Sequence, residues 1–358
     1  MGGMKEEWIM TEAAALLLAW YDAHARSLPW RGIHDPYRTW VSETMLQQTR
    51  VETVLAYYDR FLQRFPTVEA LAAAPEDDVL KLWEGLGYYR RARNLHRGAK
   101  QVMEEFGGIM PSSAEQLRKI HGVGDYTAGA IASIAFDQPV PAVDGNVIRV
   151  VSRLRGIREN VGVPSVRRQL TAEAAALVPA ERPGDFNQAL MDLGSAVCVP
   201  GTPSCERCPL QTLCDACREG DAEDLPLLPR KNPPRVIDYD LCLIFSGDRV
   251  LMRQRTEAML QGLWVFPLIE EHHDAEQLPG LLRRSLGVTT GPAEAAGEAR
   301  HIFTHQVWQM KLYVLHAPEN TAAPDGWRWL TRRDMDALTI PTAVRVAANK
   351  ARDILSRK

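Results

Sequence analysis

The sequence has no hydrophobic stretch long enough to cross a membrane, few cysteines and almost no net charge. Its longest apolar run covers residues 13–21, nine residues, whereas a membrane-spanning helix needs roughly 20. Three acids and one lysine precede this run, which is not the pattern of a secretion signal. Six cysteines and 46% hydrophobic residues exclude a disulfide scaffold and a disordered chain. We therefore expect a globular protein of the cytoplasm that does not contact membranes.

The charge balance restricts where on the chain nucleic acid can bind. The sequence holds 42 basic and 45 acidic residues, a net charge of −3, so a protein that coats nucleic acid non-specifically is disfavoured. Any nucleic-acid surface must be local. Two stretches without acids, 86–100 and 145–158, are rich in arginine. Taken alone, each is more typical of a solvated helix face than of a nucleic-acid surface.

The pattern of apolar residues divides the 358 residues into two domains. Apolar residues recur every three or four positions through 11–218, which predicts an all-α domain over 1–218. An acidic and then proline-rich connector covers 219–235. After it, alternating segments at 237–245, 250–255, 263–269, 307–315 and 327–330 predict strands, and 276–286 and 343–355 predict helices. The second domain, 236–358, is therefore expected to be α+β.

Four cysteines lie close together as Cys198-x6-Cys205-x2-Cys208-x5-Cys214. In a reducing compartment, such spacing favours a metal site over disulfides. Zinc and an iron–sulfur cluster both take four thiolates, and spacing alone leaves both open. The remaining two cysteines, Cys217 and Cys242, are interpreted as ordinary thiols.

Three further features of the helical domain carry candidate chemistry. Gly122 and Gly124 form a turn between two predicted helices, where amide N–H groups at a helix start suit a phosphate, although a purely structural turn fits as well. Glu43 has apolar neighbours at helical spacing, which should raise its pKa unless it lies on the surface. Asp144 comes where a helix begins, as an N-cap residue would.

These features occur in the order typical of one family. The sequence closely resembles the MutY family of adenine DNA glycosylases, within the helix-hairpin-helix superfamily that includes endonuclease III. The matching segments are 28–31, 41–51, 83–89, 122–124, 143–146, 186–194 and the four-cysteine loop. The resemblance implies a helix-hairpin-helix over 117–136 and a [4Fe-4S] cluster on the loop 198–214, held by Cys198, Cys205, Cys208 and Cys214.

The resemblance also implies roles for the candidate residues. Glu43 would protonate adenine N7, and Asp144 would stabilise or capture the sugar cation. Tyr126 and Asn146 match hydrogen-bonding partners of this pair. Further matches are Arg31 on the adenine, Gln188 where some relatives have Glu, and Gln48, Thr49, Leu86 and Tyr88 around the opposite base.

One absence separates this chain from strand-cleaving relatives. Their lysine nucleophile falls at the position of Tyr126, and a phenol cannot form a Schiff base. The resemblance therefore implies a monofunctional glycosylase, acting as a monomer on duplex DNA with adenine opposite 8-oxoguanine or guanine. The base must leave the helix to be reached.

The segment 262–267 makes the second domain similar to the Nudix fold, whose pyrophosphatases hold magnesium with clustered Glu residues. Here Arg284 and Ser285 fall where two of those ligands belong, so nucleotide hydrolysis is not expected. In the family this domain helps to recognise 8-oxoguanine through Phe-Ser-His. This chain has Thr304 at the serine position, which keeps the hydroxyl and adds a methyl group.

Three other classes compete with this interpretation. An endonuclease III-like lyase would need the missing lysine, and a Nudix hydrolase would need the missing acids. A non-catalytic damage-binding protein or an iron–sulfur redox sensor on DNA would not need both Glu43 and Asp144.

Overall fold

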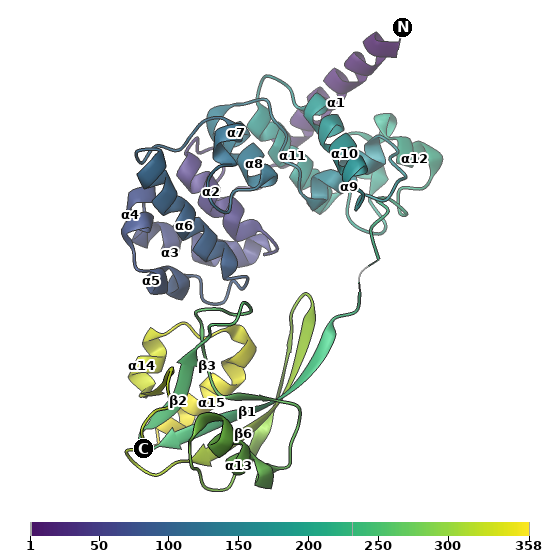
Figure 1. Cartoon of the computed structure of the whole chain (residues 1–358). Coiled ribbons are helices and arrows are strands. Elements are labelled where there is room, and N and C mark those ends of the chain that lie inside the picture. Colours follow the sequence, from purple (N-terminus) through teal and green to yellow (C-terminus); the bar gives the residue numbers. More distant parts are fainter. Residues whose placement is uncertain (1, 231, 358) are drawn as a thin grey trace. The chain divides into compact units, whose positions relative to one another are not determined.

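The computed structural model (Figure 1) describes residues 2–230 and 232–357 and divides into two compact units. The first comprises Met1–Ala74 and Arg90–Arg230, and the second Pro75–Tyr89 and Lys231–Lys358. Met1, Lys231 and Lys358, which the expected domain boundaries include, lie outside the described residues. No helix of the described part is both long and apolar enough to cross a bilayer.

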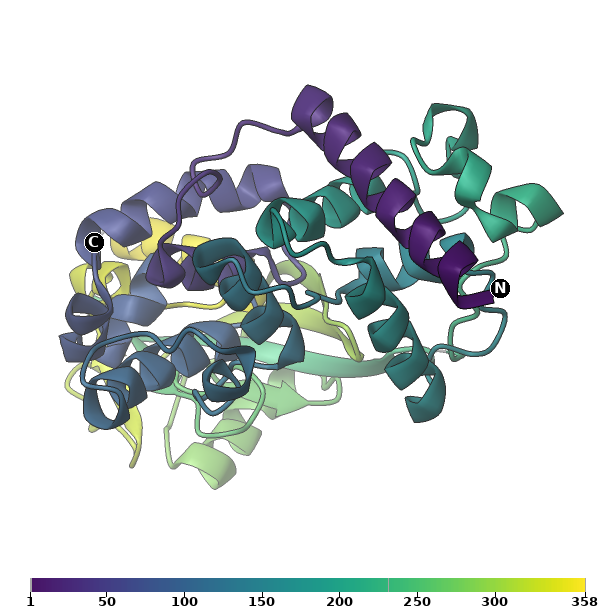
Figure 2. The same ribbon diagram turned by 90° about the horizontal axis from the view of Figure 1, so that it is seen from above.

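The first unit is helical throughout its described residues. Its helices are α1 (Gly2–His24), α2 (Pro36–Leu46), α3 (Val51–Arg64), α4 (Val68–Ala73), α6 (Arg90–Glu105), α7 (Ala114–Leu117), α8 (Asp125–Phe136), α9 (Gly145–Leu154), α10 (Pro164–Leu177), α11 (Pro183–Ala196) and α12 (Asp215–Glu219), with 3₁₀ turns η1 (Cys205–Arg207) and η2 (Gln211–Leu213). The long α1, dark purple in Figure 2, packs on α10 and α11.

Capping residues in the sequence determine where several of these helices begin. The side chains of Asp35, Thr67, Ser113 and Asp144 accept backbone N–H bonds at the first turns of α2, α4, α7 and α9. Each such bond satisfies an N–H group that has no partner within the helix. Asp144 is therefore fixed at the N-terminus of α9, where the sequence predicts it.

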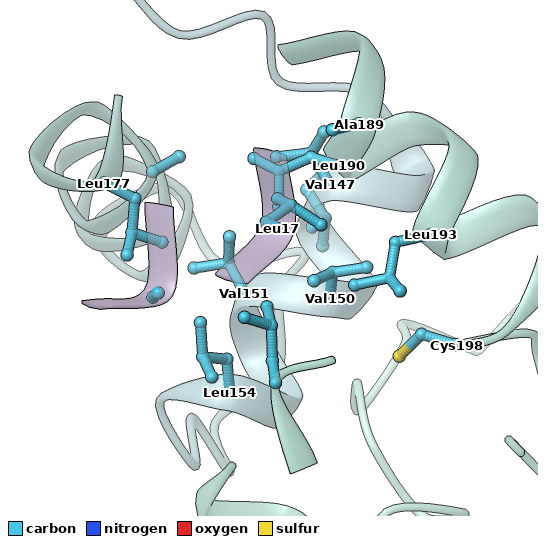
Figure 3. Packing of buried hydrophobic residues seen from close by; sticks show 14 of the residues in the cluster. Leu17, Val147, Val150, Val151, Leu154, Leu177, Ala189, Leu190, Leu193 and Cys198 are labelled. Carbon is cyan, nitrogen blue, oxygen red and sulfur yellow. The ribbon is translucent and has the colours of Figure 1, made fainter. Parts of the chain in front are cut away.

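One core of the first unit forms where α1, α9, α10 and α11 meet. Val147, Val150, Val151 and Leu154 form the buried stripe of α9, and side chains of the other helices surround them (Figure 3). Cys198 lies at the border of this cluster. The core thus reaches from the beginning of α9 to the cysteine loop.

The helix-hairpin-helix consists of α7, a short turn and α8. Gly122 in this turn has a φ of +80°, and a Cβ built on it would lie 2.5 Å from the Cβ of Asn94. Glycine is therefore required at position 122 for both conformation and space. Gly124 caps α8 with a φ of −90°, and a Cβ there would meet nothing within 4 Å.

The second unit has a seven-stranded sheet. The strands are β1 (Arg235–Ser246), β2 (Arg249–Gln254), β3 (Trp264–Val265), β4 (Leu268–Glu270), β5 (Glu294–Ile302), β6 (Gln306–His316) and β7 (Trp327–Leu330), in the order β3-β2-β1-β6-β5, with β4 paired to β1 and β7 to β2. Among the described strands, only β1 and β6 pair in parallel, from Arg235↔Gln306 to Phe245↔His316. The prediction of an α+β fold is confirmed, but β5 was not among the predicted strands.

Helices cover both faces of this sheet. Apolar residues of α14 (Arg332–Ala337) and α15 (Arg345–Leu355), including Met335 and Ala351, pack in one core, and Leu278 and Leu282 of α13 (Leu278–Leu286) pack in the other. The two predicted helices are confirmed, with starts two residues later than expected. The 3₁₀ turns η3 (Ala275–Gln277) and η4 (Thr342–Val344) precede α13 and α15.

Residues 75–89, with α5 (Glu76–Leu82), belong to this second compact unit. Lys81 Nζ donates to the carbonyl of Leu338 over 2.9 Å, and the Ile340 N–H donates to the Glu84 carboxylate over 3.0 Å. Lys81 also pairs with Glu84 at 2.7 Å. The domain limits 1–218 and 236–358 stay predictions, because packing alone does not define an independently folding domain.

The hairpin geometry predicts opposite outcomes for its two glycines. We expect Gly122→Ala to lower the free energy of unfolding by more than about 1 kcal/mol, because its φ is positive and its Cβ site is occupied. Gly124→Ala should change it by less than about 0.5 kcal/mol. Urea unfolding of both variants measures the difference, and equal losses would contradict it.

Candidate functional site

A cavity of about 790 Å³ in the first unit gathers most of the predicted catalytic residues. Its lining includes Glu43 from α2, Tyr126 from α8, Asp144 and Asn146 from the start of α9, and Gln188 from α11. These positions lie up to 145 residues apart in the chain. Arg31 and Thr49 also line the cavity, so seven predicted site residues share one space.

Glu43 is buried in α2 together with the apolar residues Trp40, Val41 and Met45. Its helical spacing from apolar neighbours predicts this burial. Its side chain is only 6% exposed, and burial raises the pKa of Glu43 to about 7. The Asp144 charge raises it further, whereas the Tyr126 hydrogen bond and Arg31 act to lower it. A carboxyl with this pKa holds a proton near neutral pH and can donate it.

Tyr126 is the direct partner of that carboxyl. Its hydroxyl donates to Oε2 of Glu43 and lies 3.6 Å from Sδ of Met191. Burial and the nearby carboxylates raise the pKa of Tyr126 well above its ordinary range. The phenol therefore stays protonated and acts as a fixed hydrogen-bond donor.

Asp144 is both a helix cap and a lining residue of the cavity. Its Oδ1 accepts the Val147 N–H over 2.7 Å, and its Oδ2 accepts from Nδ2 of Asn146 over 2.8 Å. Burial raises the pKa of Asp144, while the bonds from Val147 and Asn146 and the charge of Arg149 oppose that rise. Burial is the largest of these influences on the pKa of Asp144.

A chain of hydrogen bonds continues from Asp144 to the cysteine loop. Nη2 of Arg149 donates to Oδ1 of Asn146 over 2.8 Å and to the carbonyl of Gly194 over 2.7 Å. Its Nε donates to the carbonyl of Cys198 over 2.7 Å. Sequence reasoning treated Arg149 only as part of a basic stretch. Its spacing of three from Asn146, on one face of α9, was the available signal.

A second buried acid, Asp192, escaped the sequence prediction. Asp192 is 3% exposed. Its carboxylate accepts a hydrogen bond from Nη1 of Arg31 over 2.7 Å and also forms an ion pair with Arg26. Asp192 lies four residues after Gln188 and therefore on the same side of α11. Gln188 donates its amide to the Gly184 carbonyl over 3.3 Å. Arg31, which lines the cavity, is thus held in place by a carboxylate.

The expected DNA-wedge residues fall in both units. Thr49 accepts from Nη2 of Arg91 over 3.0 Å, and Gln48 has a positive φ of 56°. Arg91, another residue that sequence reasoning missed, also donates to the carbonyls of Thr44 and Met45 and so fixes the end of α2. Leu86 is 6% exposed and belongs to the second unit.

Tyr88 and Thr304 are brought together within the second unit. The Tyr88 hydroxyl and the Thr304 hydroxyl lie 2.9 Å apart. Tyr88 is 49% exposed and has a φ of +46°. Phe303 packs edge-on against Trp308, with ring centroids 5.0 Å apart, which fixes the loop that carries Thr304. Two predicted recognition residues therefore present adjacent hydroxyls to solvent.

The four predicted thiols line one small cavity of about 20 Å³, and Cys217 lines it too. Val150, Leu154, Leu193 and Val197 form much of its apolar wall. Burial raises the pKa of the Cys208 thiol to about 12 and that of Cys205 to about 11. In the described part of the chain, no three His, Cys, Asp or Glu side chains converge on a single metal ion.

The donor set of this cavity suits a thiolate-bound cluster. Arg153, 2% exposed, directs Nη1 to Sγ of Cys198 at 3.3 Å and to the carbonyl of Val199 at 2.8 Å. Its positive charge offsets thiolate charge inside an apolar wall. Cys217, interpreted above as an ordinary thiol, was detectable because Cys214-x2-Cys217 repeats the spacing of Cys205-x2-Cys208.

Comparisons with known proteins give the same assignment. Residues 41–175 match the model of the HhH-GPD superfamily base excision DNA repair proteins, and residues 241–350 match the NUDIX domain. The chain is 38% identical to the adenine DNA glycosylase of Mus musculus over 92% of this chain and 76% of that protein. Identity to the Homo sapiens adenine DNA glycosylase is 37%, over 92% and 72%.

Solved structures resemble the helical unit. A thermostable thymine-DNA glycosylase is 28% identical, with a TM-score of 0.53 over 59% of this chain and 97% of that one. A non-covalent endonuclease III–DNA complex, at 23% identity and a TM-score of 0.50 over 59% and 97%, shows the same fold.

The fold and the buried acid pair define a helix-hairpin-helix base excision repair protein with a Nudix-like second domain. Its sequence identity to adenine DNA glycosylases places the chain in one family within this class. The chain belongs to the adenine DNA glycosylase family.

The raised pKa of Glu43 predicts a pH dependence of stability. The folded pKa, about 7, exceeds the ordinary value of 4.5, so the folded state keeps a proton that the unfolded state releases. This contribution to stability is complete below pH 4.5 and lost as the pH rises through 7. Glutamine does not titrate, so Glu43→Gln does not lose this contribution. The free energy of unfolding of Glu43→Gln, relative to that of the unmodified protein, should therefore be higher at about pH 8 than at about pH 5. Urea unfolding at both values measures it, and a pH-independent difference would contradict it.

Proposed function

We propose that the protein is a monofunctional adenine DNA glycosylase that hydrolyses the N-glycosidic bond of adenine opposite 8-oxoguanine or guanine. The observation that carries the proposal is the pair Glu43 and Asp144, two acids of different environment in one cavity. Its volume, about 790 Å³, lies in the range of small-molecule sites and can admit a flipped base. We further propose that the protein acts as a monomer, in the cytoplasm at the nucleoid.

Glu43 supplies the proton in this mechanism. Protonation of adenine at N7 makes the base a better leaving group, and the C1′–N9 bond breaks as the sugar becomes cation-like. The burial that raises the pKa of Glu43 makes this donation possible near neutral pH. Tyr126, hydrogen-bonded to the same carboxyl, fixes its orientation.

Asp144 stabilises the positive charge that develops on the sugar. The bonds from Val147 and Asn146 favour its carboxylate form and hold it at the edge of the cavity. Water then adds its oxygen to C1′ and releases a proton, which leaves adenine and an abasic site. Arg31 and Gln188 line the space that the base would occupy.

The monofunctional assignment rests on the absence of an amine. Among the described residues that line the cavity there is no lysine, and Tyr126 occupies the position expected for one in strand-cleaving relatives. A Schiff base with the sugar needs a primary amine. Hydrolysis by water is therefore the proposed reaction, without strand cleavage.

We also propose that Cys198, Cys205, Cys208 and Cys214 hold a [4Fe-4S] cluster. When bound, such a cluster supplies redox-active iron and crosslinks the loop that carries its ligands. Arg149 and Arg153 hold that loop from α9 by bonds to Cys198, Val199 and Gly201. The same α9 begins with Asp144, so an ordered loop supports the geometry of the acid.

The second unit is proposed to recognise 8-oxoguanine through the hydroxyls of Thr304 and Tyr88. Oxidised guanine carries an N7–H donor that guanine lacks, and a hydroxyl can accept from it. The two hydroxyls lie 2.9 Å apart, so Tyr88 can orient the lone pairs of Thr304. Gly122 and Gly124 are proposed to contact a phosphate at the start of α8, and Gln48, Thr49 and Leu86 to contact the distorted duplex.

A gel assay tests the proposed reaction. Duplexes with A:8-oxoguanine, A:G and A:T should give strand breaks with the first two, and only after alkali treatment. Glu43→Gln should slow single-turnover excision by roughly 10²–10⁴-fold, because an amide donates no proton. Breaks without alkali, or a borohydride-trapped protein–DNA adduct, would contradict the monofunctional assignment.

The recognition role of Thr304 is tested with a matched pair of variants. Thr304→Val removes the hydroxyl and keeps the shape, so the ratio of A:8-oxoguanine to A:G excision rates should fall about 5- to 100-fold, as for one good base contact. Thr304→Ser should retain the ratio. Thr321→Val, which removes a hydroxyl that donates to the Pro318 carbonyl over 2.6 Å, serves as the control. An unchanged ratio in Thr304→Val would exclude the role.

A further inference from the structure

The cavity of the cysteine loop contains one more thiol than a four-iron cluster requires. Cys198, Cys205, Cys208 and Cys214 account for the four ligands, and Cys217 lines the same space. Cys217 lies in α12, and Cys214 is the N-cap of that helix. A spacing of three along a helix places two side chains on one side, so α12 directs both toward the cavity.

The side chain of Cys217 lines the cavity together with that of Cys205, a ligand from the turn η1, and its electrostatic influence helps to raise the pKa of the Cys205 thiol. Through its backbone N–H, Cys217 also interacts with Cys214. Cys198, by contrast, is 8% exposed, packs at the border of the core around α9 and meets Arg153. Cys217 is therefore placed to replace Cys205 and not to replace Cys198.

Cys205 and Cys217 cannot both bind a cluster that already has three other ligands, because only one iron remains. They can, however, reach the same iron in turn. Cys205 and Cys217 are both only partly buried, and both belong to short elements of three and five residues. A small movement of either element is enough to exchange them.

We propose that Cys217 is an alternative ligand of the [4Fe-4S] cluster, which binds the iron of Cys205 when Cys205 is lost or displaced. In the exchange an Fe–S bond to Cys217 forms and the Fe–S bond to Cys205 breaks. Cys217 releases its proton and the departing Cys205 thiolate takes one up, so no oxidant or reductant is needed. The inference rests on the proposed cofactor, and the experiment separates the two.

The experiment measures iron per chain and the visible absorption of anaerobically purified full-length protein. Cys205→Ala should retain most of the iron of the unmodified protein, whereas Cys205→Ala/Cys217→Ala should lose at least about nine-tenths of it. Cys208→Ala serves as a matched control and should lose its iron, because the groups that influence the Cys208 thiol are Leu210 and the other three ligands and do not include Cys217. Cys242→Ala, a fully buried thiol of the other unit, should change nothing.

Alkylation of free thiols gives a second readout that does not depend on yield. In the unmodified protein, iodoacetamide should label Cys217 and spare the four ligands. In Cys205→Ala, and in Cys205→Ser, Cys217 should become protected. Labelled Cys217 in both variants, or iron and folded protein in Cys205→Ala no higher than in the double variant, overturns the proposal. Absence of iron from the unmodified protein would instead refute the cofactor itself.

Discussion

The hydrogen bond from the Val147 N–H to Asp144 is the interaction on which the helical unit depends. It begins α9, and α9 serves three regions at once. Its apolar stripe, with Val150, Val151 and Leu154, packs in the core that α1, α10 and α11 share. Its polar stripe continues from Asp144 through Arg149 to the carbonyl of Cys198. A capped and straight α9 therefore sets the positions of the acid, the core and the cysteine loop together.

The two carboxyls differ because their surroundings provide different donors. Glu43 receives one hydrogen bond, from a phenol that is itself buried and resists ionisation. Asp144 receives a backbone N–H and a side-chain amide and also feels the charge of Arg149. Both are buried, so desolvation opposes ionisation of each. The number of donors, and not burial alone, separates a proton donor from a carboxylate that can face a cation.

Features that depend on residues close together in the sequence could be predicted from it. Helical spacing predicted the apolar setting of Glu43, and capping chemistry predicted the beginning of α9 at Asp144; both agree with the structure. The pattern failed for β5, whose alternating residues are mostly exposed or half-buried, with small side chains at 295, 296 and 299. A strand defined by its pairing with β6, rather than by its own apolar face, leaves little periodic signal.

Residues that act through distant partners were the ones missed. Asp192 matters because Arg31, 161 positions earlier, folds against it. Arg91 holds carbonyls at the end of α2, and Arg153 holds the loop after Cys198. No spacing rule connects such partners, since only the packing of helices brings them together. Cys217 was missed for a different reason. Its spacing from Cys214 is visible in the sequence, but a four-ligand cluster requires no fifth thiol.

The contact between the hydroxyls of Tyr88 and Thr304 connects the backbone conformation of one loop to the proposed recognition of the opposite base. Tyr88 adopts a left-handed backbone conformation, which costs about 1 kcal/mol or more for a residue with a side chain. Gly85 and Gly87, which precede it with φ values of +107° and +72°, adopt positive φ without this cost because they lack a Cβ. A hydrogen bond contributes about 1 kcal/mol in return. The loop is therefore ordered at little net gain in stability, which is reasonable for a segment whose hydroxyls are fixed in advance for a ligand.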